Sequence, residues 1–298
     1  MELTVFLNYL EYEKRYSEHT IIAYKRDLEQ FWAFLSHNYE TTEWAKIKSM
    51  HLRSWVVQLM QDNLSATTIH RKISSLKTYH KFLLIRKSIP VSVFPHVLLP
   101  KKAERLPAYV EESQLEKLQT DICFPEGFAG LRDYLLLEIL YITGMRRSEL
   151  IALKWGDVNM QSGHLKVVGK GNKMRLIPFG DELKITFLKY RKFVKKSFPD
   201  LGVEFVLLTD KGKKMYPKFV YNKVNRYLSL VTTSKKRSPH ILRHSFATHL
   251  SNNGADLNAI KELLGHANLA ATQVYTHNSI EQLKKVYEQA HPKAKNKK

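Results

Sequence analysis

The side chains best suited to chemistry are cations and imidazoles at points where the chain changes from one element to the next. Arg146 follows a nearly all-apolar segment, so a buried helix end delivers an arginine. Lys170 lies in residues 169–173, whose Gly and Asn content predicts a hairpin tip. His240 and Arg243 are three residues apart, which places both on one side of a helix. Arginine forks suit anionic oxygens, because they stay charged and can bind two oxygens at once.

Two other chemistries fit these segments less well. Residues 169–173 lack the G-x-x-x-x-G-K-[ST] pattern of a nucleotide-binding loop, and the segment that follows is expected to be a strand rather than a helix. A plain surface hairpin is the alternative there. His240 and His244 are four residues apart, as zinc ligands often are, but no carboxylate shares their stripe. We expect no metal site, and structural histidines are the ordinary alternative.

The elements that must position Arg146 and Lys170 are a buried helix and a hairpin. Residues 131–143 read as the buried helix, which Gly144 ends. Residues 164–168 and 174–178 read as the two strands of the hairpin. Ser113 is predicted to cap a short helix before them.

Three more helices are expected toward the C-terminus. Pro239 fits the first turn of the helix that carries His240 and Arg243. Its core stripe is expected to comprise Leu242, Phe246 and Leu250. A second helix runs over residues 256–264 and closes at Gly265. The last covers about residues 279–289, and its apolar stripe comprises Ile280, Leu283 and Val286.

The first hundred residues read as helices over residues 2–15, from Ser17 onward, over about 50–61, and after Ser65. The helix after Ser65 has an apolar face and an opposite face that is small, polar and basic. That second face comprises Thr67, Arg71, Ser74, Thr78 and Lys81. An ordinary solvated helix is one interpretation. The other is a helix laid along DNA, where basic groups neutralise phosphates and hydroxyls donate hydrogen bonds.

The charge and length of the chain indicate the kind of partner and the number of domains. The 298 residues include 48 Lys and Arg against 28 Asp and Glu, a net charge of +20, which favours a polyanion as partner. Residues 1–100 hold 13 basic and 9 acidic side chains, so most of the positive charge lies in the rest of the chain. The length and a proline-bounded polar stretch predict two domains, residues 1–99 and 109–298, joined by a linker over 100–108.

The lone cysteine, Cys123, and the first residues of the chain indicate the cellular compartment of the protein. A single cysteine makes no intramolecular disulfide, and the N-terminus has no signal-peptide pattern. No apolar run approaches the roughly 18 residues that a bilayer span needs. We expect a cytoplasmic protein associated with the nucleoid, with no membrane partner.

Five segments together resemble the motifs of tyrosine site-specific recombinases, the phage integrase family, in both order and spacing. They are residues 143–150, 169–173, 240–244, 264–266 and 275–277. The intervals are 24 residues from Arg146 to Lys170, 23 from Arg243 to His266 and 9 on to Tyr275. The segments around Ser17 and Ser65, and the ending at residues 286–294, resemble Xer-type members of the family.

The resemblance implies a fold that is mainly α with a small antiparallel β-sheet. Its N-terminal part would be a four- or five-helix core-binding, SAM-like domain that contacts DNA. The implied DNA-binding residues are Thr20, Tyr24, Lys25, Arg71, Ser74, Thr78 and Lys81. The C-terminal part would be an α+β catalytic domain. Its last helix would dock on a neighbouring protomer through the stripe of Ile280, Leu283 and Val286, and packing of that stripe within its own chain is the alternative.

The resemblance also implies roles for the site residues. Arg146 and Arg243 would clamp a DNA phosphate, and Lys170 would protonate the departing 5′-oxygen as general acid. These positive charges would make metal dispensable, and no ATP would be needed because a covalent link preserves the energy of the phosphodiester.

The remaining roles belong to the histidines, the tyrosine and one carboxylate. His240 would accept or orient the tyrosine proton, and His266 would donate a hydrogen bond to the phosphate. Tyr275 would form the covalent 3′-phosphotyrosine. Glu149 would orient a group of the site; a plain surface salt bridge is its alternative.

The expected partners follow from strand exchange between two DNA sites. The family works as a homo- or heterotetramer on double-stranded DNA, and its Xer-type members resolve chromosome dimers at cell division, with a division-linked DNA translocase as a further partner. A mobile-element integrase or DNA invertase, and a type IB topoisomerase, are the alternatives with the same chemistry. From another class, a non-catalytic DNA-binding protein would explain the charge alone.

Overall fold

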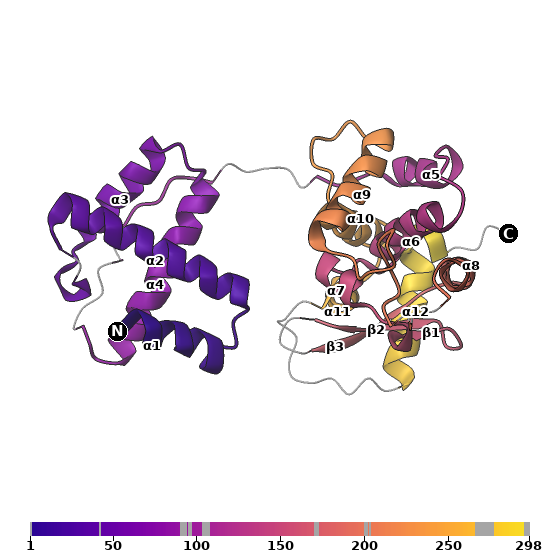
Figure 1. Ribbon diagram of the computed structural model, residues 1–298, viewed down its shortest axis with the longest axis horizontal. Helices are drawn as coiled ribbons and strands as arrows, with labels where there is room; N and C mark the ends of the chain where they lie inside the picture. The colour runs from indigo at the N-terminus through magenta and orange to yellow at the C-terminus, as the bar shows by residue number, and fades with distance from the viewer. Residues whose placement is uncertain are drawn as a thin grey trace. The chain divides into compact units, whose positions relative to one another are not determined.

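The computed structural model describes residues 2–41, 43–89, 94, 97–102, 108–169, 173–199, 202, 204–265 and 277–294. The chain divides into two compact units, Met1–Leu106 and Pro107–Lys298 (Figure 1). The expected linker, residues 100–108, includes residues 103–107, which lie outside the described residues, so its limits stay a prediction.

The N-terminal unit is helical throughout its described secondary structure. Its elements are α1 (Glu2–Asn8), a π-helical turn (Tyr9–Glu13), α2 (Glu18–Tyr39), a 3-10 turn (Trp44–Lys46), α3 (Ser49–Gln61) and α4 (Ala66–Ile85). Helix α4 begins after Ser65 as expected, and the hydroxyl oxygen of Ser65 caps it by accepting a hydrogen bond from the backbone N–H of Thr68. The core is rich in aromatic rings, with Phe31, Trp44 and Tyr79 packed edge to face in the middle of the unit.

The C-terminal unit combines helices with a small sheet. Its helices are α5 (Glu112–Thr120), α6 (Phe128–Thr143), α7 (Arg147–Ala152), α8 (Asp181–Ser197), α9 (Pro217–Val231), α10 (Pro239–Asn252), α11 (Leu257–Leu264) and α12 (His277–Ala290). The 3-10 turns are Trp155–Asp157 and Pro292–Ala294. The described residues thus confirm the expected class, mainly α with a small antiparallel sheet.

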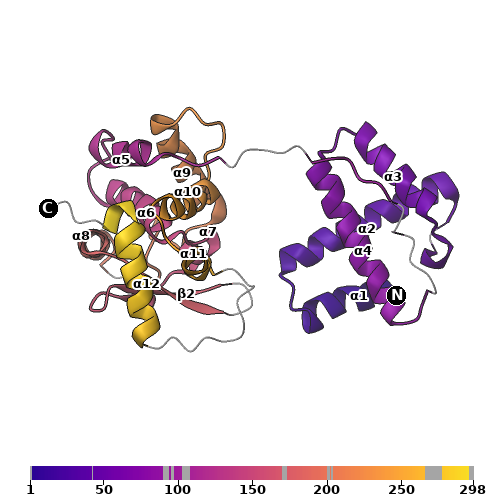
Figure 2. The ribbon, with the colours of Figure 1, turned by 180° about the vertical axis from the view of Figure 1, so that it is seen from behind.

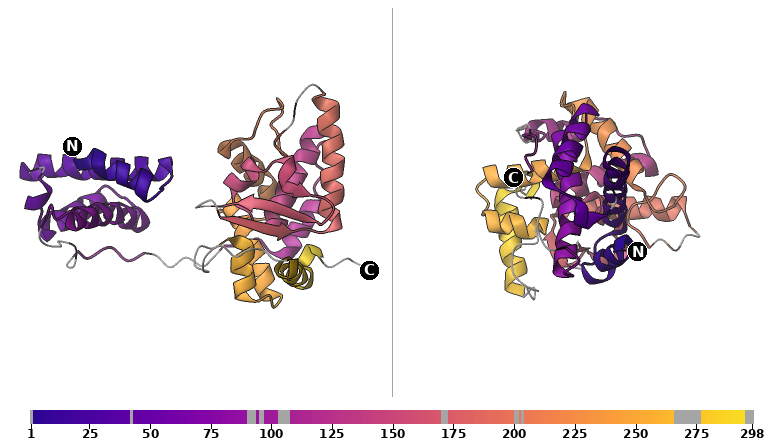
Figure 3. Two further views of the ribbon diagram at one scale, coloured as in Figure 1. Left: turned by 90° about the horizontal axis from the view of Figure 1, so that it is seen from below. Right: turned by 90° about the vertical axis from the view of Figure 1, so that its left-hand side faces the viewer.

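The sheet of this unit has three strands in the described part of the chain, β1 (Val158–Asn159), β2 (His164–Val168) and β3 (Met174–Pro178), in the order β1-β2-β3. All neighbours are antiparallel, with Leu165 opposite Ile177 and Val167 opposite Arg175. These four side chains are buried, so Arg175 lies on the same inward face as Ile177. Figure 3 shows the sheet on one side of the unit, where α11 and α12 pack against β3.

Helix α6 is the central element of the C-terminal unit. It is buried along nearly its whole length and packs against α8 on one side and α10 on the other. It ends at Gly144, whose backbone has a left-handed conformation with φ +57°. A Cβ at that position would lie 2.4 Å from Cδ1 of Phe246, so glycine is required by both the conformation and the space.

One local expectation changes in the structure. The cap at Ser113 is wrong, because α5 begins one residue earlier and its N-cap is Glu111, whose backbone N–H donates 3.3 Å to Oε1 of Gln114. Helix α12 packs against β3, α10 and α11 of its own chain (Figure 2). The side chains of Ile280 and Leu283 lie outside the described residues, Val286 is half-buried, and Tyr287 and Ala290 are buried in the unit. Docking of this helix on a neighbouring protomer stays a prediction.

Among the described residues, none of the helices has both the length and the apolar character that a membrane span requires.

Candidate active site

Arg146 is the N-cap residue of α7, directly after the turn at the end of α6. Its backbone N–H donates a 2.7 Å hydrogen bond to Oε2 of Glu149, and its Nη1 lies 2.9 Å from Oε1 of the same carboxylate. Glu149 therefore caps the helix and holds the arginine side chain. The side chain of Arg146 is 33% exposed while that of Glu149 is 4% exposed, so the arginine faces outward from a buried support.

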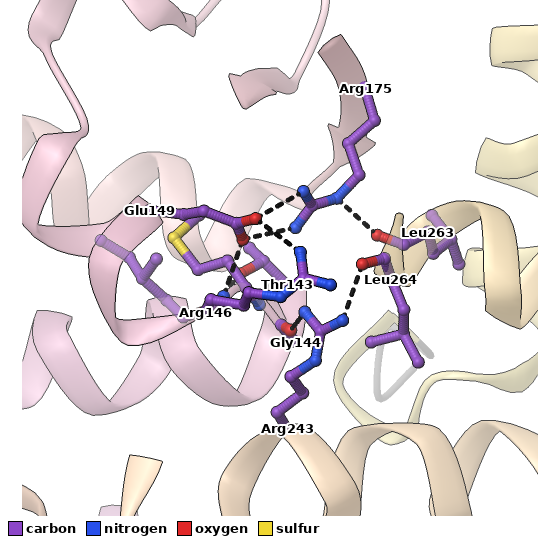
Figure 4. Close-up of polar contacts among 10 residues, drawn as sticks. Thr143, Gly144, Arg146, Glu149, Arg175, Arg243, Leu263 and Leu264 are labelled. Atoms are coloured by element: carbon purple, nitrogen blue, oxygen red, sulfur yellow. Dashed lines mark hydrogen bonds and ion pairs between the residues drawn. The ribbon is translucent and has the colours of Figure 1, made fainter. Parts of the chain in front are cut away.

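Arg175 holds the other side of the Glu149 carboxylate. Its Nη1 lies 3.0 Å from Oε1 and its Nη2 lies 2.7 Å from Oε2, a two-pronged contact (Figure 4). Its Nε donates 2.8 Å to the carbonyl oxygen of Leu263 in the last turn of α11. The Arg175 side chain is 4% exposed. It joins α7, β3 and α11 at one point.

Arg243 occupies the neighbouring position, on α10. Its Nη1 donates 2.7 Å to the carbonyl oxygen of Gly144 and its Nη2 donates 2.7 Å to the carbonyl oxygen of Leu264. Arg175 and Arg243 thus bind consecutive carbonyl groups, those of Leu263 and Leu264, at the end of α11. Together with Arg146 they form the cluster of three guanidinium groups drawn in Figure 4. These carbonyls belong to the helix terminus that has no intrahelical donors left.

The electrostatics of the cluster favour a bound anion. Arg146, Arg175 and Arg243 gather around one carboxylate, Glu149, so positive charge is in excess. Burial, followed by the charges of Arg146 and Arg175, lowers the pKa of Arg243 to about 10. Arg243 stays protonated at neutral pH. A phosphate at the exposed side would balance the excess charge.

Glu149 stays ionised in this setting. Burial by itself would raise the pKa of Glu149, but hydrogen bonds and charge from Arg175, together with the hydrogen bonds from Arg146, outweigh it and hold the pKa below its usual range. Because Glu149 is buried and bridges two arginines, it is not a surface salt bridge.

Arg175 is not among the site residues predicted from the sequence. The sequence does contain an indication of its burial. Side chains of a strand alternate between its two faces, and Arg175 is two residues before the buried Ile177, so both lie on the inward face of β3. An arginine at an inward-facing strand position needs an anionic partner.

The other predicted site residues divide into one described and three not. His240 lies in the first turn of α10, three residues before Arg243, and is exposed. Lys170, His266 and Tyr275 lie outside the described residues. Gly169 and Gly265 are the last described residues before Lys170 and His266, so the structure shows where the segments that carry these two residues begin.

The predicted DNA-binding residues lie on α2 and α4 of the N-terminal unit. On α2, Thr20 pairs with Ser17 through their hydroxyl groups and the exposed Lys25 is 3.8 Å from Glu29. Tyr24 is half-buried, and its hydroxyl lies 3.4 Å from that of Thr78 on α4. The structure therefore brings two of the predicted residues, Tyr24 of α2 and Thr78 of α4, together.

On α4, the face opposite the core is exposed as expected, including Arg71, Ser74 and Lys81. Arg71 has a partner that the sequence did not indicate, because its guanidinium forms a two-pronged contact with the buried carboxylate of Asp27. Lys72, which is buried, also binds Asp27 at 3.1 Å. Asp27 thus orients Arg71 at the surface of the unit.

No three His, Cys, Asp or Glu side chains cluster in metal-binding geometry within the part of the chain that the structure describes.

Comparison with protein families gives two matches that together span most of the chain. Residues 108–282 match the phage integrase family, and residues 3–87 match the phage integrase N-terminal SAM-like domain. Among relatives named tyrosine recombinase XerC, that of Chlorobaculum parvum is 36% identical over 318 residues, covering 98% of this chain and 94% of its own length. That of Staphylococcus saprophyticus is 38% identical over 290 residues, covering 97% of each.

Solved structures share the fold at lower identity. A XerH site-specific recombinase bound to a palindromic difH substrate is 23% identical with a TM-score of 0.70, covering 89% of this chain and 78% of its own. The Tn1549 transposon integrase in complex with circular intermediate DNA is 20% identical with a TM-score of 0.70, covering 94% and 98%.

Proposed function

The chain belongs to the phage integrase family and is a tyrosine recombinase, an enzyme that cuts and rejoins DNA; on that premise we propose how its residues divide the chemistry. The single observation that carries the proposal is the cluster of Arg146, Arg175 and Arg243 around the one buried carboxylate of Glu149.

Arg146 and Arg243 clamp the scissile phosphate. Attack on a phosphodiester builds negative charge on its non-bridging oxygens, and pre-oriented guanidinium groups stabilise that charge more in the transition state than in the ground state. Arg146 is held by Glu149 and Arg243 by two backbone carbonyls, so neither needs to reorganise when the phosphate arrives. Arg175 is too buried to reach the phosphate.

Tyr275 supplies the nucleophile and Lys170 the acid. The phenolic oxygen attacks phosphorus and forms a 3′-phosphotyrosine, while the 5′-oxygen leaves with a proton from Lys170. His240 takes or orients the phenolic proton, and His266 donates a further hydrogen bond to the phosphate. The spacing of these residues supports the assignment, as does the position of His240 one turn before Arg243.

The reaction needs neither ATP nor a metal ion in this proposal. The phosphotyrosine keeps the energy of the phosphodiester, so attack by the 5′-hydroxyl of a partner strand rejoins the DNA. Guanidinium and ammonium groups supply the positive charge that a metal would otherwise bring. Cleavage that continues at full rate in EDTA and without nucleotide is the expected result.

The substrate is a double-stranded recombination site, and the cellular task is resolution of chromosome dimers at cell division in the cytoplasm. The name of the relatives, XerC, supports this assignment. Two duplexes exchange four strands, so four protomers act together, either as one protein or with a second recombinase. A DNA translocase linked to division is the regulatory partner.

The test uses the full-length protein and a nicked recombination site that traps the covalent intermediate. Wild type is expected to form a protein–DNA adduct, and Tyr275→Phe to form none; an adduct with Tyr275→Phe would refute the nucleophile. Lys170→Ala should bind DNA normally but cleave slowly. A 5′-bridging phosphorothiolate needs no proton on its leaving group, so it should restore the rate of Lys170→Ala, and no rescue would refute the acid.

A mobile-element integrase or invertase shares this chemistry and differs in substrate. Recombination between two chromosomal sites on one supercoiled plasmid supports dimer resolution, and activity only on transposon ends would favour the alternative. Relaxation of plasmids that lack a site would indicate a topoisomerase. A protein that binds but never forms an adduct would be a non-catalytic DNA-binding protein.

A further inference from the structure

Arg175 has a position that neither its exposure nor its charge alone explains. It is an inward-facing side chain of β3, and all three of its nitrogen atoms have acceptors within the protein. These bonds use three of its five N–H donors, and the side chain is 4% exposed, so burial keeps Arg175 away from the exposed side of the cluster, where a phosphate would bind. Any effect of Arg175 on cleavage must act through the groups that it holds.

Those groups are the supports of the proposed catalytic residues. Through Glu149 it fixes the guanidinium of Arg146, because both arginines bind Oε1 of one carboxylate. Through Nε it fixes the carbonyl of Leu263, two residues before the end of the described α11 segment at Gly265. A Cβ at Gly265 would lie 3.1 Å from Cδ of Arg175, so the chain passes directly against this side chain before His266.

The base of the hairpin touches the same pair. A Cβ at Gly169 would lie 3.4 Å from Oε1 of Glu149 and 3.6 Å from Nη1 of Arg175. Gly169 is followed by Lys170, and its backbone N–H closes the hairpin with a 2.8 Å bond to the carbonyl of Lys173. The Arg175–Glu149 pair therefore lies where three segments of the proposed site begin.

We propose that Arg175 is a positioning residue for DNA cleavage, which sets Arg146 and the starts of the segments carrying Lys170 and His266 in one mutual geometry. The inference rests on the proposed function of those residues. A buried ion pair by itself is weak evidence for stability, because desolvation offsets most of the attraction and apolar side chains of the same size often serve as well. The position of the Arg175–Glu149 ion pair, where the segments that carry Arg146, Lys170 and His266 begin, indicates a role beyond stability.

The first experiment separates positioning from folding by removing the charge pair as a unit. Arg175→Met leaves Glu149 buried with one partner fewer, and it should lower both the melting temperature and the cleavage rate. The double variant Arg175→Met/Glu149→Gln has no buried carboxylate without its partner, so its melting temperature should recover toward that of wild type. Its single-turnover rate of adduct formation should stay about 10- to 100-fold below wild type, because misplacement of a reacting group by about 1 Å has that effect.

The affinity for DNA provides a second readout, because a positioning role should slow cleavage while leaving DNA binding unchanged. The dissociation constant of each variant for an uncleavable site should stay within about twofold of wild type, since Arg175 does not contact DNA. Recovery of the cleavage rate together with the melting temperature in the double variant would overturn the proposal.

Arg175→Lys keeps the charge but has a single nitrogen, so it cannot reproduce the two-pronged contact with Glu149 and the separate Nε bond to Leu263. It is expected to fold and to cleave about tenfold or more slowly. A wild-type rate for Arg175→Lys would overturn the proposal, because charge alone would then be enough.

The matched control is Arg132, a fully buried arginine of α6 paired with Asp133 and Asp210 in the same unit. Arg132→Met should lower the melting temperature without slowing cleavage at a temperature where the protein is folded. Equal slowing by Arg132→Met and Arg175→Met would show a general effect of lost stability and contradict the proposal. If wild type itself forms no adduct through Tyr275, the proposed function fails instead.

Discussion

Arg243 and Gly144 are 99 residues apart in the chain, yet Nη1 of Arg243 donates a 2.7 Å hydrogen bond to the carbonyl oxygen of Gly144. The glycine carbonyl is at the C-terminal end of α6, where helix carbonyls have no intrahelical donor and carry partial negative charge. The bond ties the turn that delivers Arg146 to the helix that delivers Arg243. The two proposed phosphate ligands are thereby fixed to one another.

Gly144→Ala tests this turn. The new methyl group would meet the ring of Phe246 at 2.4 Å in a left-handed backbone conformation, so we expect a loss of about 2–4 kcal/mol in the free energy of unfolding. The cleavage rate should fall as well, because Arg146 follows the turn. Urea unfolding and adduct formation measure the two effects. Gly156→Ala is the control: nothing lies within 4 Å of its Cβ position, and it should behave as wild type.

Glu149→Gln should destabilise the C-terminal unit by about 3–5 kcal/mol at pH 7, because it leaves the buried Arg175 without a charged partner. The pKa of Glu149 is lowered in the folded protein, so its contribution is present above the unfolded pKa of about 4.3 and is lost as pH falls through the folded pKa. The difference from wild type should therefore shrink in acid.

The surface pair of Lys154 and Glu204 provides the control for that measurement. Their side chains are 48% and 58% exposed, so Glu204→Gln should change stability little at any pH. Equal effects of Glu149→Gln and Glu204→Gln would contradict the buried bridge.

Arg243→Lys should make cleavage depend on pH in a range where wild type does not. Burial, and then the charges of Arg146 and Arg175, lower the pKa of Arg243 to about 10, and the same surroundings would lower the pKa of a lysine from its usual value of about 10.4. The variant should lose activity as pH rises above neutrality, while wild type stays charged at this position. A flat profile for the variant between pH 7 and 9 would contradict this account of the site.

His291 should make the C-terminal unit sensitive to mild acid. It is fully buried beside Tyr287, Tyr141 and Phe246, and burial lowers its pKa to about 3. Its neutral form stabilises the fold above the unfolded pKa of about 6.5, and below that pH stability should fall by as much as about 1.4 kcal/mol per pH unit. Unfolding of His291→Phe should lack this part of the slope.

The charged and titratable groups near His291 also affect its titration. The pKa of His249 is also lowered by burial, so His249 adds to the acid sensitivity, and Lys293 stays paired with Glu138 at 3.1 Å. The exposed His19 is the control, and His19→Gln should leave the slope unchanged. An unchanged slope in His291→Phe would contradict burial of a neutral His291.

Lys81→Ala should weaken DNA binding and reduce the slope of log affinity against log salt by about 0.9, the value for one phosphate contact. Arg71→Ala should do the same and also destabilise the N-terminal unit, because the buried Asp27 loses its two-pronged partner. Titrations at several salt concentrations, combined with urea unfolding, separate the two variants. An unchanged salt slope in both would place the DNA on another face.

Much of the local structure follows from local sequence patterns. The hairpin strands lie where alternation and glycine predict them, and α10 begins at Pro239 with Leu242, Phe246 and Leu250 fully buried. These features depend on neighbours within a few residues, so periodicity and capping chemistry are enough to find them. The capping error at Ser113 is of the same local kind, since Glu111 and Gln114 compete with it two residues earlier in a capping box.

The linear spacing of motifs determined the family and the list of proposed site residues. The tertiary structure decided how the described ones are held: Glu149 as a buried bridge, Arg243 on two helix-end carbonyls, and Arg71 on Asp27. It also revealed Arg175, whose partners Glu149 and Leu263 lie 26 and 88 residues away in the chain. Such contacts are set by how α6, α10, α11 and β3 pack, because a guanidinium finds its acceptors only after distant elements have been brought within 3 Å of it.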